Sequence, residues 1–210
     1  MSTVVEEEEK ETGRVEAFSD GVFAIAITLL VLEIPVTHPD TVPHGKHLAD
    51  VVLQQGPNFA AYLVSFVTIL VMWLNHHSIF QMVRRIDRLF LVLNGFLLLL
   101  VTFINYPTAL VANFIATDDE RFAAAFYAGT FVIIAVIYNL LWWRAAGGMR
   151  LIGKRVPAEQ VARMTRQYQF GPILYLLTFA LAFVNAWASL ALNGALALYF
   201  AFTGQIERTA

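Results

Sequence analysis

The chain has 210 residues, of which 58% are hydrophobic and only 14% are charged, and its formal net charge is −2. Because soluble domains are about a quarter charged, this composition predicts a protein embedded in a membrane. The small net charge gives no general attraction to nucleic acid. The chain has no cysteine, which excludes disulfides, thiolate metal sites and cysteine nucleophiles.

Apolar runs recur along the chain, each about long enough to cross a hydrocarbon layer of ~30 Å at about 1.5 Å per residue. They predict an all-α membrane protein with six transmembrane helices. The first four spans are expected over residues 18–34, 59–82, 89–113 and 122–143. The apolar region 170–202 exceeds one span, and we divide it near residues 185–189 into two short helices. A single long tilted helix is the alternative for this region.

The predicted spans form one six-helix membrane domain over residues 18–206, between an acidic N-terminal tail, 1–17, and a short C-terminal tail, 207–210. The N-terminal tail begins MSTVVEEEEKE, which is the reverse of the basic start of a signal peptide. We expect this tail to be solvated and disordered.

Basic residues are shared unevenly between the loops. Only two of the 14 lysines and arginines, Lys46 and Arg121, fall in the loops after the first and third spans. The positive-inside rule therefore predicts a multi-pass protein of the cell membrane with both termini in the cytoplasm. Residues 156–168, in the basic loop after the fourth span, predict a short amphipathic helix at the cytoplasmic surface, with its arginines against anionic headgroups.

Three polar residues are expected at one depth near the cytoplasmic side. Counted by helix rise, Asp20, His77 and Asn94 all lie roughly 5–10 Å inside the boundary of the first, second and third spans. A carboxylate, an imidazole and an amide at one level can satisfy one another's hydrogen bonds. Such a network can fix helix packing, or it can act as a proton relay or a gate latch, and the residues alone leave both interpretations open.

Other polar residues give weaker signals. Glu33 ends the first span, where a carboxylate at an outer mouth can attract cations. His76 and His77 are adjacent and point about 100° apart on a helix, so we expect no metal site there. The triplet 118–120 is acidic and is expected to be a solvated loop.

The first span carries one continuous apolar stripe. Gly21, Ile25, Leu29 and Leu32 recur at helical spacing, and Thr28 flanks them. Periodicity alone does not separate a face against lipid, a face against other helices and the wall of a pore, because all three accept isoleucine and leucine.

The start of this span resembles a known family. Arg14-x-x-x-Phe18-Ser19-Asp20, at the head of an apolar helix, is similar to the RxxxFSD motif of the transmembrane protein 175 family of potassium channels. The following GVFAIAITLLVLEI and the later WLNHH resemble its prokaryotic members. The resemblance covers essentially the whole chain.

The resemblance implies a homotetramer of six-helix subunits, in which four copies of the first helix line a central pore that holds permeant K⁺. It implies a constriction at Ile25, a selectivity role for Thr28, and further lining by Leu29 and Leu32. It also implies a polar network at the cytoplasmic side, made by Arg14, Ser19 and Asp20 and joined to His77.

The preferred function is therefore a potassium-favouring cation channel that closes at Ile25, with protons as further permeant ions. The alternative is a proton-coupled secondary transporter in which Asp20 and His77 titrate. A membrane enzyme or scaffold is a third hypothesis, but the chain shows no catalytic motif. The expected partners are the lipid bilayer, monovalent cations and further copies of the chain; no cofactor, catalytic residue or nucleic acid is expected.

Overall fold

The computed structural model describes residues 2–203, with side chains except at 2–10, 41, 202 and 203. The predicted end of the last span at 206 and the tail 207–210 lie outside this range. Within it the regular secondary structure is helical, joined by loops, apart from an isolated bridge between Val83 and Ile152. The α-helices are α1 Ser2–Leu29, α2 Leu48–Gln54, α3 Gly56–Met82, α4 Arg88–Phe103, α5 Asn105–Phe114, α6 Glu120–Ala146, α7 Ala158–Gln169, α8 Gly171–Ala182 and α9 Ala186–Thr203, and the short 3₁₀ turns are η1 Leu30–Glu33, η2 Pro39–Thr41 and η3 Gly147–Met149.

The apolar runs predicted the positions of the first four spans. In the described part of the chain, four helical stretches are long and apolar enough to cross a membrane: Glu11–Glu33, Gly56–Met82, Arg88–Phe114 and Glu120–Met149. The third of these bends at Ile104, between α4 and α5. Pro107 explains the break, because a proline at this position cannot donate to the carbonyl of Phe103 and its ring clashes with it.

The region after α7 is divided, as predicted, and is not one long helix. α8 ends at Ala182 and α9 begins at Ala186. The Asn185 side chain marks the boundary, because its Oδ1 accepts the backbone N–H of Ala188 at 2.8 Å and so caps the start of α9.

The prediction of a disordered N-terminal tail is wrong. α1 begins at Ser2, so residues 2–17 are helical; glutamate and lysine are good helix formers, and an existing helix extends easily through them.

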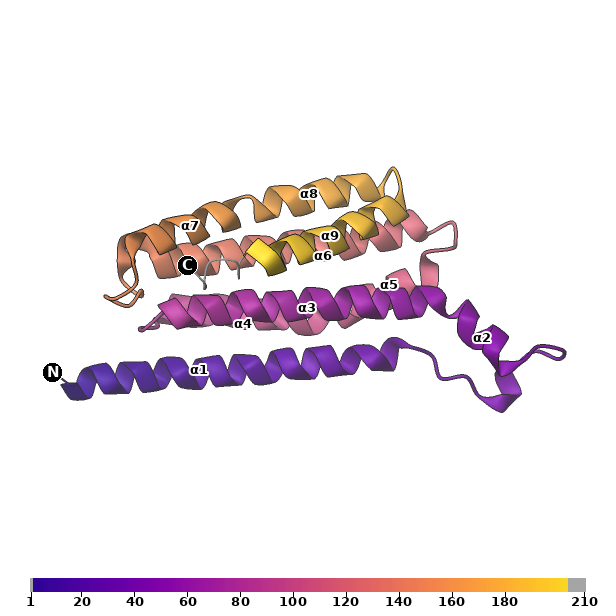
Figure 1. Cartoon of the computed structure of the whole chain (residues 1–210), viewed down its shortest axis with the longest axis horizontal. Helices are drawn as coiled ribbons and strands as arrows, with labels where there is room; N and C mark the ends of the chain where they lie inside the picture. Colours follow the sequence, from indigo (N-terminus) through magenta and orange to yellow (C-terminus); the bar gives the residue numbers. More distant parts are fainter. Residues whose placement is uncertain (1, 204–210) are drawn as a thin grey trace.

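The short amphipathic helix expected over residues 156–168 is confirmed as α7, and its place at the cytoplasmic surface stays a prediction. α7 continues the line of α8 along α6 (Figure 1). Trp142 of α6 contacts α7 directly, because its indole Nε1 donates to Thr165 Oγ1 at 2.8 Å.

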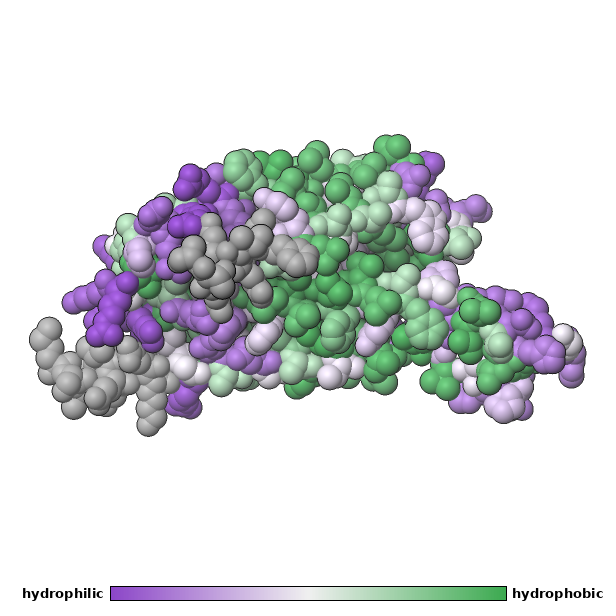
Figure 2. All heavy atoms as spheres, viewed as in Figure 1, coloured by the Kyte–Doolittle hydropathy of each residue, from purple (hydrophilic) through white to green (hydrophobic). Residues whose placement is uncertain are grey.

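The helices run side by side in successive antiparallel passes, with α1 at one edge and α7–α8 at the other (Figure 1). α1 packs on α3 and α4, α6 lies against α4 and α8, and α9 lies against α3 and α8. The surface over the middle of the helices is apolar, and polar residues gather toward the two ends (Figure 2). This is the surface that a chain crossing a bilayer requires.

The two basic loops meet at the end of the molecule where α1 begins. Arg84 N donates to Leu151 O at 2.9 Å, and Gly153 N donates to Met82 O at 2.9 Å. Thr12 Oγ1 of α1 donates to Arg84 O at 3.3 Å. The loops after α3 and after α6 therefore lie on one side of the apolar belt, as the alternation of charge along the sequence indicates. Together they hold Arg84, Arg85, Arg150, Lys154 and Arg155.

Candidate functional site

α1 has two unlike faces. Ser19, Phe23, Ala26 and Leu30 are buried, and their spacing of four, three and four residues places them on one side of the helix, toward α3 and α4. The stripe predicted from the sequence lies elsewhere on the helix and is exposed in the subunit: Ile25 is 58% exposed and Leu32 is 73% exposed. Gly21, Thr28 and Leu29 are exposed as well.

The buried face of α1 is tied to α4 and α3 by a chain of side chains. Ser19 Oγ donates to the carbonyl of Val15 at 2.9 Å and accepts Nδ2 of Asn94 at 3.0 Å. Asn94 Oδ1 lies 2.9 Å from His76 Nε2. Because an amide oxygen only accepts, His76 carries its proton on Nε2 and donates.

His76 is enclosed on every side. Its side chain has no exposed surface, and its ring packs against those of Phe23 and Phe80, with centroids 5.2 Å and 4.5 Å away. Its Nδ1 is buried and makes no hydrogen bond within the described residues. Among the described residues, Asn94 is therefore the only hydrogen-bond partner of the His76 ring.

A second set of contacts joins α1 to α3 in matched steps. Trp73 Nε1 donates to Asp20 Oδ1 at 2.9 Å, and one turn further His77 Nδ1 lies 2.9 Å from Glu16 Oε1. Gln81 Nε2 donates to His77 Nε2 at 2.9 Å, which leaves the proton of His77 on Nδ1 for Glu16. The indole of Trp73 stacks on the His77 ring, with centroids 5.7 Å apart and planes 17° apart.

The structure brings the predicted polar residues to one region, but it pairs them differently. Asp20, His77 and Asn94 were expected to satisfy one another. Instead they bond to three residues that the sequence reasoning missed: Asp20 to Trp73, His77 to Glu16, and Asn94 to His76. Asn94 also bonds to Ser19, which the sequence analysis had placed in the network. A signal for two of these was present, because Glu16 and Asp20 are four residues apart on α1 and Trp73 and His77 are four apart on the antiparallel α3.

The remaining predicted site residues lie apart from these contacts. Arg14 is exposed and takes no part in the hydrogen bonds of the described residues. Glu33 is half-buried in η1, at the far end of α1. Thr28 is exposed, and its hydroxyl donates to the carbonyl of Ile25 at 2.9 Å. Among the described residues, no group of three or more His, Asp or Glu is placed to hold a metal ion.

The comparisons with known proteins agree on one family. The model of the family described as endosomal/lysosomal potassium channel TMEM175 matches residues 14–105, from the RxxxFSD arginine to the end of α4, which include every member of the polar contacts above. A potassium channel of Chamaesiphon minutus is 50% identical over 92% of this chain and 95% of its own length. The chain belongs to the TMEM175 family. Its similarity to a potassium channel of Streptomyces collinus is 45% identity, over 91% of this chain and 92% of the relative.

Solved structures place the fold in the same family. The crystal structure of a lysosomal potassium-selective channel TMEM175 homolog from Chamaesiphon minutus superimposes with a TM-score of 0.85 and 48% identity, covering 93% of this chain and 99% of that one. A structure of the potassium channel MtTMEM175, 21% identical with a TM-score of 0.60, shares the fold. Animal relatives are longer: the chicken endosomal/lysosomal proton channel TMEM175 is 36% identical over 63% of this chain and 28% of its own length. TMEM175 is a family of ion channels and not of enzymes.

Proposed function

We propose that this TMEM175 protein is a homotetrameric cation channel of the cell membrane that favours potassium. Four copies of α1 surround a central pathway, and both termini lie in the cytoplasm. The observation that carries this proposal is the division of α1 into a face held by α3 and α4 and an apolar face that is exposed among the described residues of the subunit. The names of the bacterial relatives, each a potassium channel, support the choice of ion.

Ile25 forms the constriction in this proposal. Four isoleucine side chains at one level close a pore by excluding water, and a cation that enters a dry neck loses its hydration shell. Leu29 and Leu32 extend the apolar wall from that level. Opening then requires the α1 helices to spread or turn, so that the neck becomes wet.

Thr28 supplies the polar group nearest to this neck. Its proton is already directed at the carbonyl of Ile25, so the outward side of the hydroxyl presents oxygen lone pairs. Lone pairs are the part of a hydroxyl that stabilises a cation. Glu33, at the end of α1, adds a carboxylate at the outer mouth, which raises the local concentration of cations.

Protons are further permeant ions in this proposal. The animal relatives named proton channels support their inclusion. The alternative is a proton-coupled transporter that uses Asp20 and His77, which bond to Trp73 and to Glu16 and not to each other. No observation favours that alternative over a channel.

The test is ion flux from the purified protein in liposomes under separate potassium, sodium and proton gradients. We expect passive flux that is fastest for potassium. Ile25→Asn is expected to raise the resting flux and weaken selectivity, because it wets the neck. Ile133→Asn is the matched control: it makes the same change at a 53% exposed isoleucine of α6 and should leave flux unchanged. Saturable flux that requires a counter-gradient, or equal effects of both variants, would contradict the proposal.

A further inference from the structure

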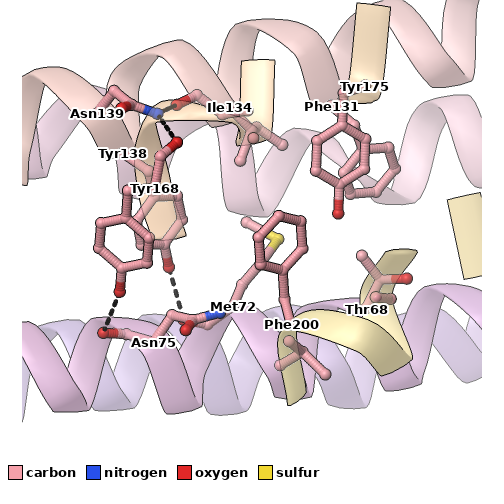
Figure 3. A pocket seen from close by; sticks show the side chains of 14 residues that line it. Thr68, Met72, Asn75, Phe131, Ile134, Tyr138, Asn139, Tyr168, Tyr175 and Phe200 are labelled. Atoms are coloured by element: carbon pink, nitrogen blue, oxygen red, sulfur yellow. Dashed lines mark hydrogen bonds between the residues drawn. The ribbon is translucent and has the colours of Figure 1, made fainter. Parts of the chain in front are cut away.

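A cavity of about 60 Å³ lies inside the subunit between α3, α6, α8 and α9 (Figure 3). α3 lines it with Thr68, Met72 and Asn75, which lie on a different face of that helix from Trp73 and His77, the residues that bond to α1. Aromatic and aliphatic side chains make up most of the remaining wall, and no charged side chain lines it.

Two polar groups on this wall make no hydrogen bond to the residues that the structure describes. Asn139 is 5% exposed, and its Nδ2 donates to Ala135 O at 3.0 Å and to Tyr168 O at 2.8 Å. Its Oδ1 is buried and accepts no hydrogen bond from the described residues. The Tyr175 hydroxyl, which points from α8 toward the side of Thr68 in Figure 3, likewise makes none with that part of the chain. A fully buried oxygen such as Asn139 Oδ1 is rarely left without a partner in native proteins, and the half-buried Tyr175 adds a second hydroxyl that can bind one.

The size and chemistry of the cavity select the partner. One water molecule needs roughly 10–15 Å³ of such space, whereas a cavity that binds benzene is about 150 Å³. A space of about 60 Å³ therefore has room for two water molecules and excludes ring-sized ligands, and the two polar groups, not the volume, set the number at two. The wall also supplies the further oxygen that a water needs, since Thr68 Oγ1 donates to Val64 O at 2.7 Å, hydrogen-bonds to Tyr127, and retains a second lone pair as an acceptor.

We propose that this cavity binds two ordered water molecules, one on Asn139 Oδ1 and one between the hydroxyls of Tyr175 and Thr68. Asn139 and Tyr175 lie toward opposite ends of the cavity in Figure 3, with Met72 and Ile134 between them, so each water has its own polar end.

The waters lie where α3 meets the helices of the other half of the subunit. Beside the cavity, Tyr138 Oη donates to Met72 O at 2.6 Å and Tyr168 Oη donates to Asn75 O at 3.3 Å, which fixes α6 and α7 to two carbonyls of α3. The same stretch of α3, residues 72–77, carries on its other face the side chains that hold α1. Occupancy of the cavity by water therefore sets the position of the segment that orients α1, and its influence on ion flux rests on the proposed function.

The first test is a structure of the full-length wild-type protein at a resolution that shows ordered water. We expect two water peaks, within hydrogen-bond distance of Asn139 Oδ1 and of the Tyr175 hydroxyl. Tyr175→Phe should lose the second peak, and Tyr106→Phe, which removes an exposed hydroxyl on α5, should keep both. A map that resolves water elsewhere in the interior but none in the cavity, or that shows a larger molecule there, would overturn the proposal.

The second test is thermal unfolding in detergent. If water binds, Tyr175→Phe removes one of its partners and should lower Tm by about 2–4 °C, as expected for the loss of one hydrogen bond in a chain of this size. If the cavity is dry, the same change only removes an unsatisfied hydroxyl, and Tm should stay the same or rise. Tyr106→Phe should not change Tm in either case.

The coupling to α1 is tested by combining Tyr175→Phe with Trp73→Phe in a double-mutant cycle of Tm. Coupled positions should lose less together than the sum of their separate losses, whereas strictly additive losses would overturn the coupling. Neither Tm nor the water peaks depend on conduction. A wild-type protein that carries no potassium flux would therefore contradict the proposed function and leave the water site standing.

Discussion

Asn94 is the residue on which the attachment of α1 most depends, and Asn94→Ala should be strongly destabilising. The change removes two inter-helix hydrogen bonds, to Ser19 and to His76. Such bonds contribute about 0.6 kcal/mol each on average inside a membrane protein. It also leaves His76 with both ring nitrogens unpaired within the described residues, which costs roughly a further 1–3 kcal/mol. The sum is about 2–4 kcal/mol, or a fall in Tm of about 4–16 °C.

The assay is thermal unfolding in detergent, followed by tryptophan fluorescence, with two companion variants. Ser19→Ala keeps the bond between Asn94 and His76 and should cost only about 1 kcal/mol. Asn113→Ala is the matched control, because Asn113 is exposed and its amide donates only to Ala109 O in its own helix. An Asn94→Ala protein within about 2 °C of wild type, or no more affected than Asn113→Ala, would refute the role given to this network.

Three further predictions concern other contacts. Trp73→Phe leaves the Asp20 carboxylate without its donor and should lower the free energy of unfolding by about 1–3 kcal/mol, more than Asp20→Asn, which keeps an acceptor oxygen; the reverse order would contradict the contact. Arg144 holds the pKa of Asp87 below its ordinary value of 3.8, so this pairing stabilises the fold above that pH and fades as pH falls through the lower folded value; unfolding against pH should show this loss in wild type and not in Asp87→Asn. Met149 has φ 57°, in the left-handed region, and Met149→Gly should raise Tm by about 2 °C; a fall would show that its side chain matters more than its backbone.

The sequence was sufficient for features that depend on distance along one helix. Span positions follow from apolar length, and the break before α9 follows from a region too long for one span, with Asn185 as its cap. Depth could be counted in the same way, which is why Asp20, His77 and Asn94 were correctly expected near one another. In each case the quantity is a number of residues multiplied by a fixed rise.

The rotation of one helix against another was not available from a single sequence. His76 and His77 are neighbours, but about 100° of rotation directs one to Asn94 and the other to Glu16. From the sequence, His77 was expected to bond to Asn94. Its depth was right, but its side chain points toward α1 and not toward Asn94. For the same reason, the amphipathic pattern of α7 predicted a one-sided helix but not that α6 covers its apolar side, where Val161 and Tyr168 are buried.

The FSD part of the RxxxFSD motif sets the rotation of α1 about its own axis, relative to α3 and α4. Phe18, Ser19 and Asp20 are consecutive and point in three directions: Phe18 is 67% exposed, Ser19 is buried against Asn94 of α4, and Asp20 reaches Trp73 of α3. Turning α1 by one residue, about 100°, would bury the phenylalanine or expose the serine, and both polar bonds would break. Positions seven and fourteen residues after Phe18 return to nearly the same side of a helix, and they are Ile25 and Leu32. The hydrogen bonds of Ser19 and Asp20 therefore determine that Ile25 and Leu32, which lie about two and about four turns after Phe18, face away from the subunit. In the proposed channel, a substitution that breaks these bonds should alter ion selectivity even though Ile25 and Leu32 are unchanged.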